Sequence, residues 1–220
     1  DMRFKRYLHD QINWNARIVG IKGARGVGKT TLLLQHIKLA HKNFDETLWV
    51  SLDNLWFMNH DIDEFVDYLN KRGVTTLYFD EIHKLPNWVT HLKNYYDSYP
   101  DLKIVYTGST MLEIDNSKAD LSRRQTLYTL AGMSFREYLE FEGVLTVPKI
   151  QLDDAISNHI KIASEISSKV KILKHFENYL NNGVYPFYKS SGPDFHTQLA
   201  ATVNLAIETD MPAITDVTYA

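Results

Sequence analysis

One segment, Gly23 to Thr30, constrains the fold of this chain more than any other part of the sequence. It reads GARGVGKT and matches the pattern G-x-x-x-x-G-K-[ST] in full. The preceding residues, RIVGIK from Arg17 to Lys22, are rich in β-branched side chains and predict a strand, whereas the residues from Thr30 to Lys42 favour a helix. Because strand, glycine loop and helix follow in this order, the segment predicts a P-loop.

The residue types of this loop suit the phosphates of a nucleoside triphosphate. Glycines let backbone N–H groups converge on an anion, and the positive end of the following helix lies at the same point. Lys29 is expected to reach the β and γ phosphates, and Thr30 to place its hydroxyl on Mg²⁺. We therefore expect ATP with Mg²⁺ as the cofactors, and nucleotide contacts from Gly23, Ala24, Arg25, Gly26, Val27, Gly28, Lys29, Thr30 and Thr31. The alternative is a glycine-rich turn that contains Lys-Thr by chance.

An apolar run that ends in two carboxylates follows roughly fifty residues after the loop. Leu77 to Phe79 precede Asp80 and Glu81, as in a strand that lies beside the P-loop strand. Asp80 is expected to hold the Mg²⁺ shell, and Glu81 to orient and polarise an attacking water. The pair favours hydrolysis over binding alone, although an acidic surface turn is the simpler alternative.

The alternation of strand and helix patterns predicts a parallel, doubly wound sheet of about five strands, the fold of P-loop NTPases. The remaining predicted strands are residues 47–52, 75–79, 103–107 and 126–130, and the remaining predicted helices are 62–71 and 88–96. After Pro148 the pattern changes, because apolar residues recur at helical spacing from Ile156 to Leu180 and predict one long amphipathic helix ending at Asn182-Gly183. A further helix is predicted for residues 198–208. We expect a P-loop domain at 1–147 and a lid-like helical region at 148–220, truncated before a further domain.

Composition narrows the function classes only modestly. The 24 Lys and Arg against 27 Asp and Glu give no global attraction toward nucleic acid. Cysteine is absent, which removes disulfides and cysteine nucleophiles. The charged first residues exclude a signal peptide, and no apolar run is long enough to span a membrane. We expect a cytoplasmic protein without membrane partners.

Two further groups of polar residues are candidates for the site. The strand ending in Tyr106-Thr107-Gly108-Ser109-Thr110 is expected to point its tip toward the nucleotide, so that Ser109 or Thr107 senses the γ-phosphate. Arg123 and Arg124 are candidates for stabilising the transferring phosphoryl group, within one chain or across a subunit interface. An ordinary polar turn and a solvated arginine pair are the alternatives.

Two other enzyme classes share parts of this pattern. Asp80-Glu81-Ile82-His83 spells the D-E-x-H box of one helicase class, but the residues after Pro148 are too few for a second motor domain, and His83 is interpreted as structural. A small-molecule kinase shares the P-loop, but the tandem carboxylates favour water as the acceptor. The four tryptophans, Trp14, Trp49, Trp56 and Trp88, are interpreted as core residues, with packing of one on adenine as the alternative.

The order of four segments resembles one family. GARGVGKTTLL, LYFDEIHKLPNW, YTGST and the arginine pair followed by AGMSFREYL are similar to the prokaryotic AAA+-related ATPases (AAA_14-like) that carry a C-terminal nuclease-like domain. The resemblance covers roughly Arg17 to Tyr138 and implies that Arg124 is the family's arginine and Ser109 its polar sensor. Gly132 stands where the family has proline, and Arg123 where it has glycine. Asn182 to Pro186 is similar to the family's G-x-x-P turn.

The leading hypothesis is a Mg²⁺-dependent AAA+-like ATPase whose hydrolysis drives or switches an attached C-terminal effector region. The residues expected to act in catalysis are Glu81, Lys29, Ser109 and Arg124, with Thr30 and Asp80 at the metal. The alternative is a nucleotide-sensing switch with negligible turnover. The expected partners are ATP and ADP and, as an option, further copies of the chain. Nucleic acid is expected only through the missing domain.

Overall fold

The computed structural model describes residues 4–41, 44–109 and 121–210. Its centre is a parallel sheet of five strands in the order β2-β3-β4-β1-β5. The strands are β1 (Ile18–Lys22), β2 (Thr47–Ser51), β3 (Thr76–Asp80), β4 (Lys103–Gly108) and β5 (Thr126–Thr129). Every neighbouring pair runs parallel, so all five carboxyl ends lie at one edge of the sheet. The P-loop NTPase fold predicted from the sequence is confirmed.

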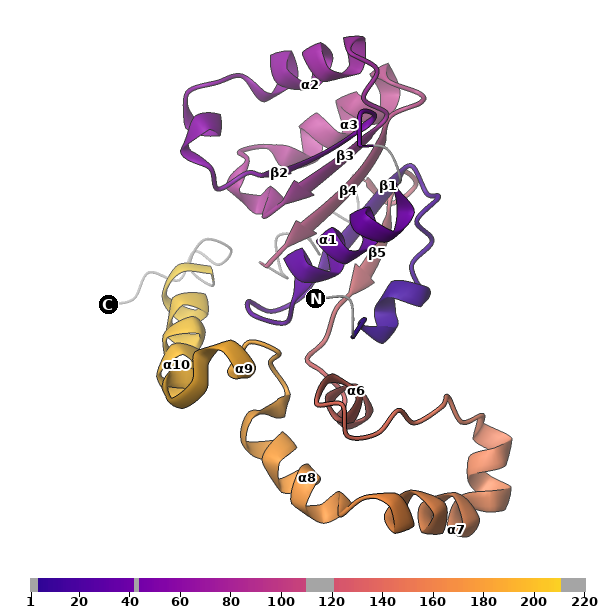
Figure 1. Cartoon of the computed structure of the whole chain (residues 1–220). Helices are drawn as coiled ribbons and strands as arrows, with labels where there is room; N and C mark the ends of the chain where they lie inside the picture. Colours follow the sequence, from indigo (N-terminus) through magenta and orange to yellow (C-terminus); the bar gives the residue numbers. More distant parts are fainter. Residues whose placement is uncertain (1–3, 42–43, 110–120, 211–220) are drawn as a thin grey trace.

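Helices cover both faces of this sheet (Figure 1). On one face, α1 (Lys29–Ala40) packs through residues such as Leu32 and Leu33 against Val19 and Val105. On the other face, α2 (Ile62–Lys71) and α3 (Trp88–Ser98) pack on a cluster that contains Leu77 and Phe79. Successive strand residues therefore serve opposite cores, which is why the strands read as nearly continuous apolar runs.

The start of α2 illustrates how local sequence sets these boundaries. The Asp61 carboxylate accepts hydrogen bonds from the backbone N–H groups of Asp63 and Glu64, which satisfies two donors that the first turn leaves open. Ile62 and Val66 are buried, and four-residue spacing puts them on one face. The helix ends before Gly73, whose φ of 89° suits the residue after a helix.

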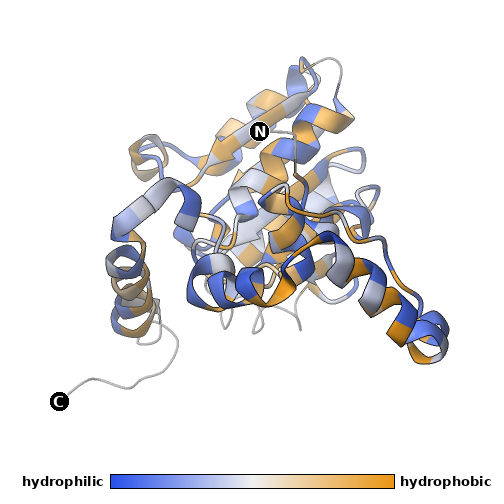
Figure 2. Ribbon diagram, turned by 60° about the horizontal axis from the view of Figure 1, so that its bottom comes forward, coloured by the Kyte–Doolittle hydropathy of each residue, from blue (hydrophilic) through white to orange (hydrophobic). Residues whose placement is uncertain are grey.

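A second, helical part of the chain lies beyond the carboxyl edge of the sheet (Figure 1). It consists of α6 (Phe135–Phe141), α7 (Leu152–Lys169), α8 (Ile172–Asn178), α9 (Tyr188–Ser191) and α10 (Phe195–Leu205). A π-helical turn at Tyr179–Gly183 and a 3₁₀ turn at Gly192–Asp194 connect the later helices, and a π-helical turn at Ala206–Asp210 follows α10. Figure 2 shows hydrophilic and hydrophobic residues alternating along these helices. The predicted helical region is therefore present.

The single long helix predicted for residues 156–180 is wrong. The backbone becomes extended at Val170, with φ −150° and ψ 146°, and this residue separates α7 from α8. The helix α7 buries none of its residues, whereas Ile172 and Tyr179 pack on a cluster formed by Met133, Tyr138 and Leu139. The break turns the chain toward that cluster, and contacts with distant residues of this kind override periodicity.

Three further 3₁₀ turns lie at Tyr7–Asp10, Leu55–Met58 and Ile82–Lys84. Across the described ranges, no helix is both long and apolar enough to cross a membrane.

Candidate functional site

The predicted P-loop lies at the carboxyl edge of the sheet, between β1 and α1. Lys22, the last residue of β1, pairs in register with Gly108 of β4 on one side and Thr129 of β5 on the other. Asp80 ends β3, the next strand beyond β4. Parallel strands thus bring residues that follow three separate strands to one place, as expected of a doubly wound sheet.

Lys29 lies near the end of the P-loop, and its side chain reaches back to the first residues of that loop. Its ammonium group donates to the carbonyl oxygens of Gly23 at 2.9 Å and Ala24 at 3.1 Å, and to Ser109 Oγ at 2.9 Å. The residue is buried. A buried ammonium group at the first residues of the loop is well suited to meet an anionic ligand.

Asp80 joins the helix α1 to strand β4. Its Oδ2 accepts from Thr30 Oγ1 at 2.7 Å, and its Oδ1 accepts from Thr107 Oγ1. Both threonines hold the carboxylate in one orientation, and Asp80 is almost fully buried. A hydroxyl and a carboxylate oxygen at hydrogen-bond distance are the hard donors that Mg²⁺ takes while keeping several waters. The residues present therefore fit this ion.

Glu81 has an unusual backbone. Its φ of 55° and ψ of 50° are left-handed, a conformation that costs a residue other than glycine about 1 to 3 kcal/mol. The Glu81 N–H donates to Thr107 Oγ1 at 3.2 Å, and Lys84 N–H donates to the Glu81 carbonyl at 2.9 Å. These bonds turn the side chain back toward the end of β4. Backbone strain at a carboxylate in such a place is typical of functional sites.

Ser109 connects the lysine to this glutamate. Its hydroxyl lies 3.0 Å from both Oε1 and Oε2 of Glu81 while it accepts from Lys29. His83 Nδ1 lies 3.3 Å from Glu81 Oε2 and adds a polar contact on the same carboxylate. The structure thus brings Lys29, Ser109, Glu81, Asp80 and Thr30 together. Thr110 lies outside the described residues.

The turn at residues 184–187, which follows the π-helical turn at Tyr179–Gly183, packs on the P-loop. A Cβ atom added to Gly26, which has φ of 81°, would lie 2.7 Å from the ring of Phe187, and one added to Gly28 would lie 3.8 Å from Pro186. Gly132 leaves space for Val184 in the same way, and Met133 N–H donates to the Val184 carbonyl at 2.7 Å. Two glycines of the loop therefore lie against the helical region.

A pocket of about 650 Å³ opens beside this contact. Val27, Gly28 and Thr31 form the side nearest the P-loop. The opposite side comes from the N-terminal segment, the end of α6 and the turn, with Phe4, Phe141, Glu142, Pro186 and Lys189 among its residues. Its volume and its mixture of aromatic and polar walls suit a small organic ligand. The lining residues include no tryptophan, so a tryptophan packed on a base does not agree with this pocket.

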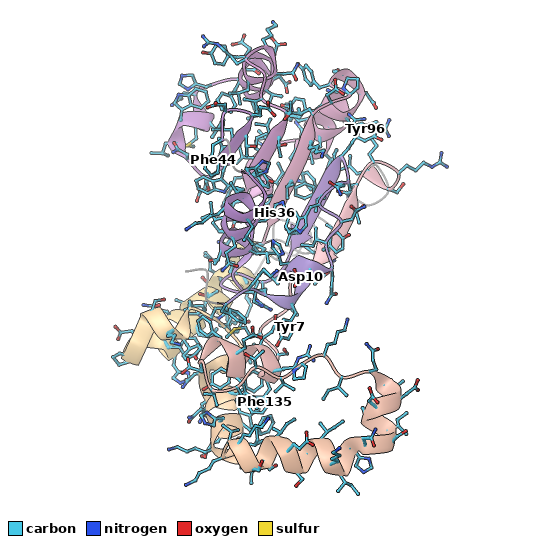
Figure 3. All side chains as sticks on the ribbon, turned by 45° about the vertical axis from the view of Figure 1, so that its right-hand side comes forward. Tyr7, Asp10, His36, Phe44, Tyr96 and Phe135 are labelled. Carbon is cyan, nitrogen blue, oxygen red and sulfur yellow. The ribbon has the colours of Figure 1, made fainter. Side chains whose placement is uncertain are left out.

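Arg124 does not lie near the P-loop of its own chain. It precedes β5, whose residue Thr126 pairs with Val19 near the beginning of β1. Four residues of extended chain, about 13 Å, separate Val19 from Gly23 at the start of the P-loop. Its guanidinium pairs with Asp97 at 3.1 Å and lies 5.7 Å from the Tyr96 ring. Tyr96 and Tyr7 lie at opposite ends of the sheet in Figure 3. A role within one chain disagrees with this placement, and a role across an interface stays a prediction.

Comparison with known families agrees with this geometry. A family model described as an AAA domain matches residues 15–139, which contain the P-loop, both carboxylates and Ser109. This chain belongs to that AAA-domain family. The match covers more than half of the chain and includes every strand of the sheet.

One relative of this AAA domain is a distant one by sequence. The chain is 25% identical over 175 residues to an uncharacterized protein, MJ1544, of Methanocaldococcus jannaschii, covering 77% of this chain and 36% of the relative. It therefore spans about a third of that protein's length.

Three solved structures that resemble this AAA domain share little sequence with it. DnaA from Aquifex aeolicus bound to AMPPCP gives a TM-score of 0.43 at 17% identity, covering 79% of this chain and 62% of that one. A DNA replication initiation factor gives 0.45 at 15%, covering 79% and 61%. PCH-2 of C. elegans gives 0.41 at 15%, covering 66% and 45%. These similarities are too weak to carry a functional conclusion.

Several residues at this site were not predicted from the sequence. They include Arg6, which contacts the loop at the Val27 carbonyl, its partner Glu137, and the aromatic residues Tyr185 and Phe187. The S-F-R-E-Y segment and the G-x-x-P turn were the available signals, because both belong to the family pattern without an obvious chemical role.

Proposed function

We propose that this AAA domain binds MgATP on the Gly23 to Thr31 segment and hydrolyses it. The observation that carries the proposal is the convergence of Lys29, Ser109 and Glu81 in one hydrogen-bonded chain beside the Thr30–Asp80 pair. A phosphate-binding lysine, a polar sensor, a metal carboxylate and a second carboxylate then lie at one sheet edge. This set is the one that hydrolysis by positioning and electrostatic stabilisation requires.

Each residue has a distinct task in the proposed reaction. Lys29 exchanges its contacts with Gly23, Ala24 and Ser109 for phosphate oxygens, which offer stronger charge-assisted hydrogen bonds. Thr30 and Asp80 hold Mg²⁺, which neutralises charge on the phosphates when bound. Glu81 orients the attacking water and accepts its proton.

The nucleoside is proposed to occupy the pocket beside the loop. Val27, Gly28 and Thr31 belong both to the P-loop region and to the pocket wall, so a ligand held by its phosphates extends into this space. Phe4, Phe141 and Pro186 supply apolar surface for a base. Because Phe141 and Pro186 come from the helical region, bound nucleotide would contact both parts of the chain.

Hydrolysis is proposed to change how the helical region sits on the sheet and so to switch an attached effector region. The Phe187 ring packs on Gly26 of the P-loop, and the Val184 side chain packs on Gly132. The loop therefore has little space to move when phosphate binds or leaves unless the turn at residues 184–187 moves with it. An effector region is part of the proposal because this chain spans only about a third of the length of MJ1544.

A nucleotide-sensing switch with negligible turnover is the second candidate. The contacts of Ser109 with both carboxylate oxygens of Glu81 favour it, because a glutamate held in this way is less available to a water. Single-turnover measurements separate the two: hydrolysis on a timescale of hours at saturating MgATP supports the switch, and turnover near or above one per second supports the enzyme.

Nucleotide binding itself is tested by equilibrium titration with fluorescent ATP and ADP analogues. The wild-type chain is expected to bind in the presence of Mg²⁺, and Lys29→Met is expected to lose most of its affinity. The exposed Lys161→Met on α7 is the matched control. Equal binding by wild type and Lys29→Met would contradict a phosphate site at this loop.

Arg124 is proposed to act across an interface between two chains. Its distance from its own P-loop leaves a neighbouring chain as the site it could serve. Sizing with ADP and with a non-hydrolysable ATP analogue is expected to show a nucleotide-dependent oligomer. A monomer under both conditions, with Arg124→Ala as active as wild type, would remove this residue from the site.

A further inference from the structure

The buried residue Arg6 links four separate segments of the chain. It precedes the 3₁₀ turn at Tyr7–Asp10, and both it and its partner Glu137 on α6 are almost fully buried. Arg6 Nε donates to Glu137 Oε1 at 2.9 Å. Nη1 donates to the Val27 carbonyl at 2.7 Å, and Nη2 donates to the carbonyl of Ala131 at 2.7 Å and of Gly132 at 3.1 Å.

The contact with Val27 bears on the P-loop backbone. A trans peptide unit is planar, and its C=O and N–H groups point in opposite directions. The guanidinium that holds the Val27 carbonyl therefore also aims the Gly28 N–H away from Arg6. Backbone N–H groups of this loop are the proposed phosphate ligands, so Arg6 fixes the direction of one of them.

The contacts with Ala131, Gly132 and Glu137 tie the same guanidinium to the start of the helical region. Glu137 is itself fixed, because it accepts from the backbone N–H groups of Tyr7 and Ser134 and caps α6 together with the Ser134 side chain. Burial raises the pKa of the Glu137 carboxyl, but the bond from Arg6 and these N–H groups outweigh burial and leave it lowered. The carboxylate is therefore ionised when it meets the guanidinium. Figure 3 shows the neighbouring Tyr7 at the junction of the two parts.

We infer that Arg6 is a positioning residue that sets the P-loop peptide between Val27 and Gly28, and that its bonds to the segment at Ala131 and to Glu137 hold its guanidinium in place. The inference rests on the proposed function, since it concerns how the same loop binds phosphate. Lysine cannot replace arginine here, because one ammonium group cannot span Glu137, Val27 and Ala131 with the fixed geometry of a guanidinium.

The experiment separates this role from a purely structural one through a double variant. Arg6→Gln alone leaves the Glu137 carboxylate buried without its cation and is expected to lower the midpoint of urea unfolding strongly. Adding Glu137→Gln removes that charge and is expected to recover the midpoint to near that of Glu137→Gln alone. Binding is measured by calorimetry with Mg-pyrophosphate, MgATP and adenosine.

The double variant is expected to bind Mg-pyrophosphate and MgATP at least about tenfold more weakly than wild type, since a hydrogen bond from a charged group is lost. Glu137→Gln alone keeps the Arg6 contact with Val27 and is expected to bind pyrophosphate within about threefold of wild type. Arg6→Lys keeps a cation beside Glu137 and is expected to unfold at a higher urea concentration than Arg6→Gln, but to bind pyrophosphate weakly.

Arg17→Gln is the matched control, because Arg17 also donates to two backbone carbonyls, those of Tyr96 and Tyr99, at the other end of the sheet. It is expected to lower the unfolding midpoint without changing pyrophosphate affinity. A folded double variant that binds pyrophosphate as tightly as wild type overturns the role of Arg6 but leaves the proposed function standing. A double variant that loses affinity for adenosine only has the same consequence. A wild-type chain that binds neither pyrophosphate nor MgATP overturns the proposed function and this inference with it.

Discussion

Ser109 Oγ accepts a hydrogen bond from Lys29 Nζ at 2.9 Å, and the same hydroxyl lies 3.0 Å from each carboxylate oxygen of Glu81. One side chain at the tip of β4 therefore touches both the proposed phosphate-binding group and the proposed general base. A change at either partner alters the contacts available to the other.

Removal of this hydroxyl tests whether it positions the two charged groups. Ser109→Ala is expected to bind ATP within about threefold of wild type but to lower kcat by tenfold or more, since hydrogen bonds to charged groups contribute about 1.5 to 3 kcal/mol. Steady-state phosphate release and ATP titration measure the two quantities, and Ser109→Thr is expected to retain part of the rate. An unchanged kcat in Ser109→Ala would remove Ser109 from the catalytic residues.

Thr107 is expected to support the metal ligand. Thr107→Val keeps the shape of the side chain but removes the donor to Asp80 and the acceptor for the Glu81 N–H. The free energy of unfolding should fall by about 1 to 3 kcal/mol, and the Mg²⁺ concentration for half-maximal ATP binding should rise several-fold. Thr76 is also buried and begins β3, at the opposite end of that strand from Asp80. Thr76→Val is therefore the control and should leave the Mg²⁺ dependence unchanged. The same shift in both variants would contradict this role.

Gly26 and Gly73 form a matched pair for the contact between the loop and the helical region. Both have a left-handed φ, 81° and 89°, so alanine strains the backbone similarly at either position. Only at Gly26 does the new Cβ meet Phe187, because nothing lies within 4 Å of a Cβ at Gly73.

The prediction is that Gly26→Ala lowers ATP affinity and increases amide hydrogen exchange over residues 184–187, whereas Gly73→Ala lowers only the stability. Hydrogen exchange with mass spectrometry and ATP titration make the comparison. Equal exchange at 184–187 in both variants would argue against a direct contact between the P-loop and this turn.

His36 is expected to make the fold sensitive to acid. Its ring stacks on Trp14 at 3.6 Å, and burial lowers its pKa from 6.5 to about 4, with repulsion from His9 and His41 acting in the same direction. Between these two values the unfolded chain binds the proton and the folded chain does not, so stability is full above pH 6.5 and is lost as the pH falls toward 4.

Urea unfolding at a series of pH values checks this expectation. His36→Gln should flatten the loss of stability between pH 6.5 and 4, and the exposed His159→Gln on α7 should leave it as in wild type. A wild-type stability that is constant over this interval would contradict the account of His36.

The sequence predicted the sheet and the order of the phosphate-site residues because both depend on local patterns. The glycine spacing of the loop and the apolar runs that end at Asp80 and Ser109 each lie within a few residues. Parallel strand register then brings their ends together without further information.

The contacts with the helical region could not be predicted in the same way. Arg6 and Glu137 are 131 residues apart, and nothing in the periodicity around either indicates a partner. The break at Val170 likewise depends on the cluster around Met133, and the placement of Arg124 depends on where β5 begins relative to β1. Each of these outcomes is set by tertiary packing and not by local propensity.

The most direct test of the proposed ATPase is phosphate release by wild type and by Glu81→Gln at saturating MgATP, with ATP binding measured on the same samples. Glutamine keeps the size of the side chain and its contact with Ser109 but cannot accept a proton from water. Glu81→Gln is expected to bind ATP about as tightly as wild type and to release phosphate about 10² to 10⁴ times more slowly. A variant that binds ATP and hydrolyses it as fast as wild type would contradict the role of Glu81.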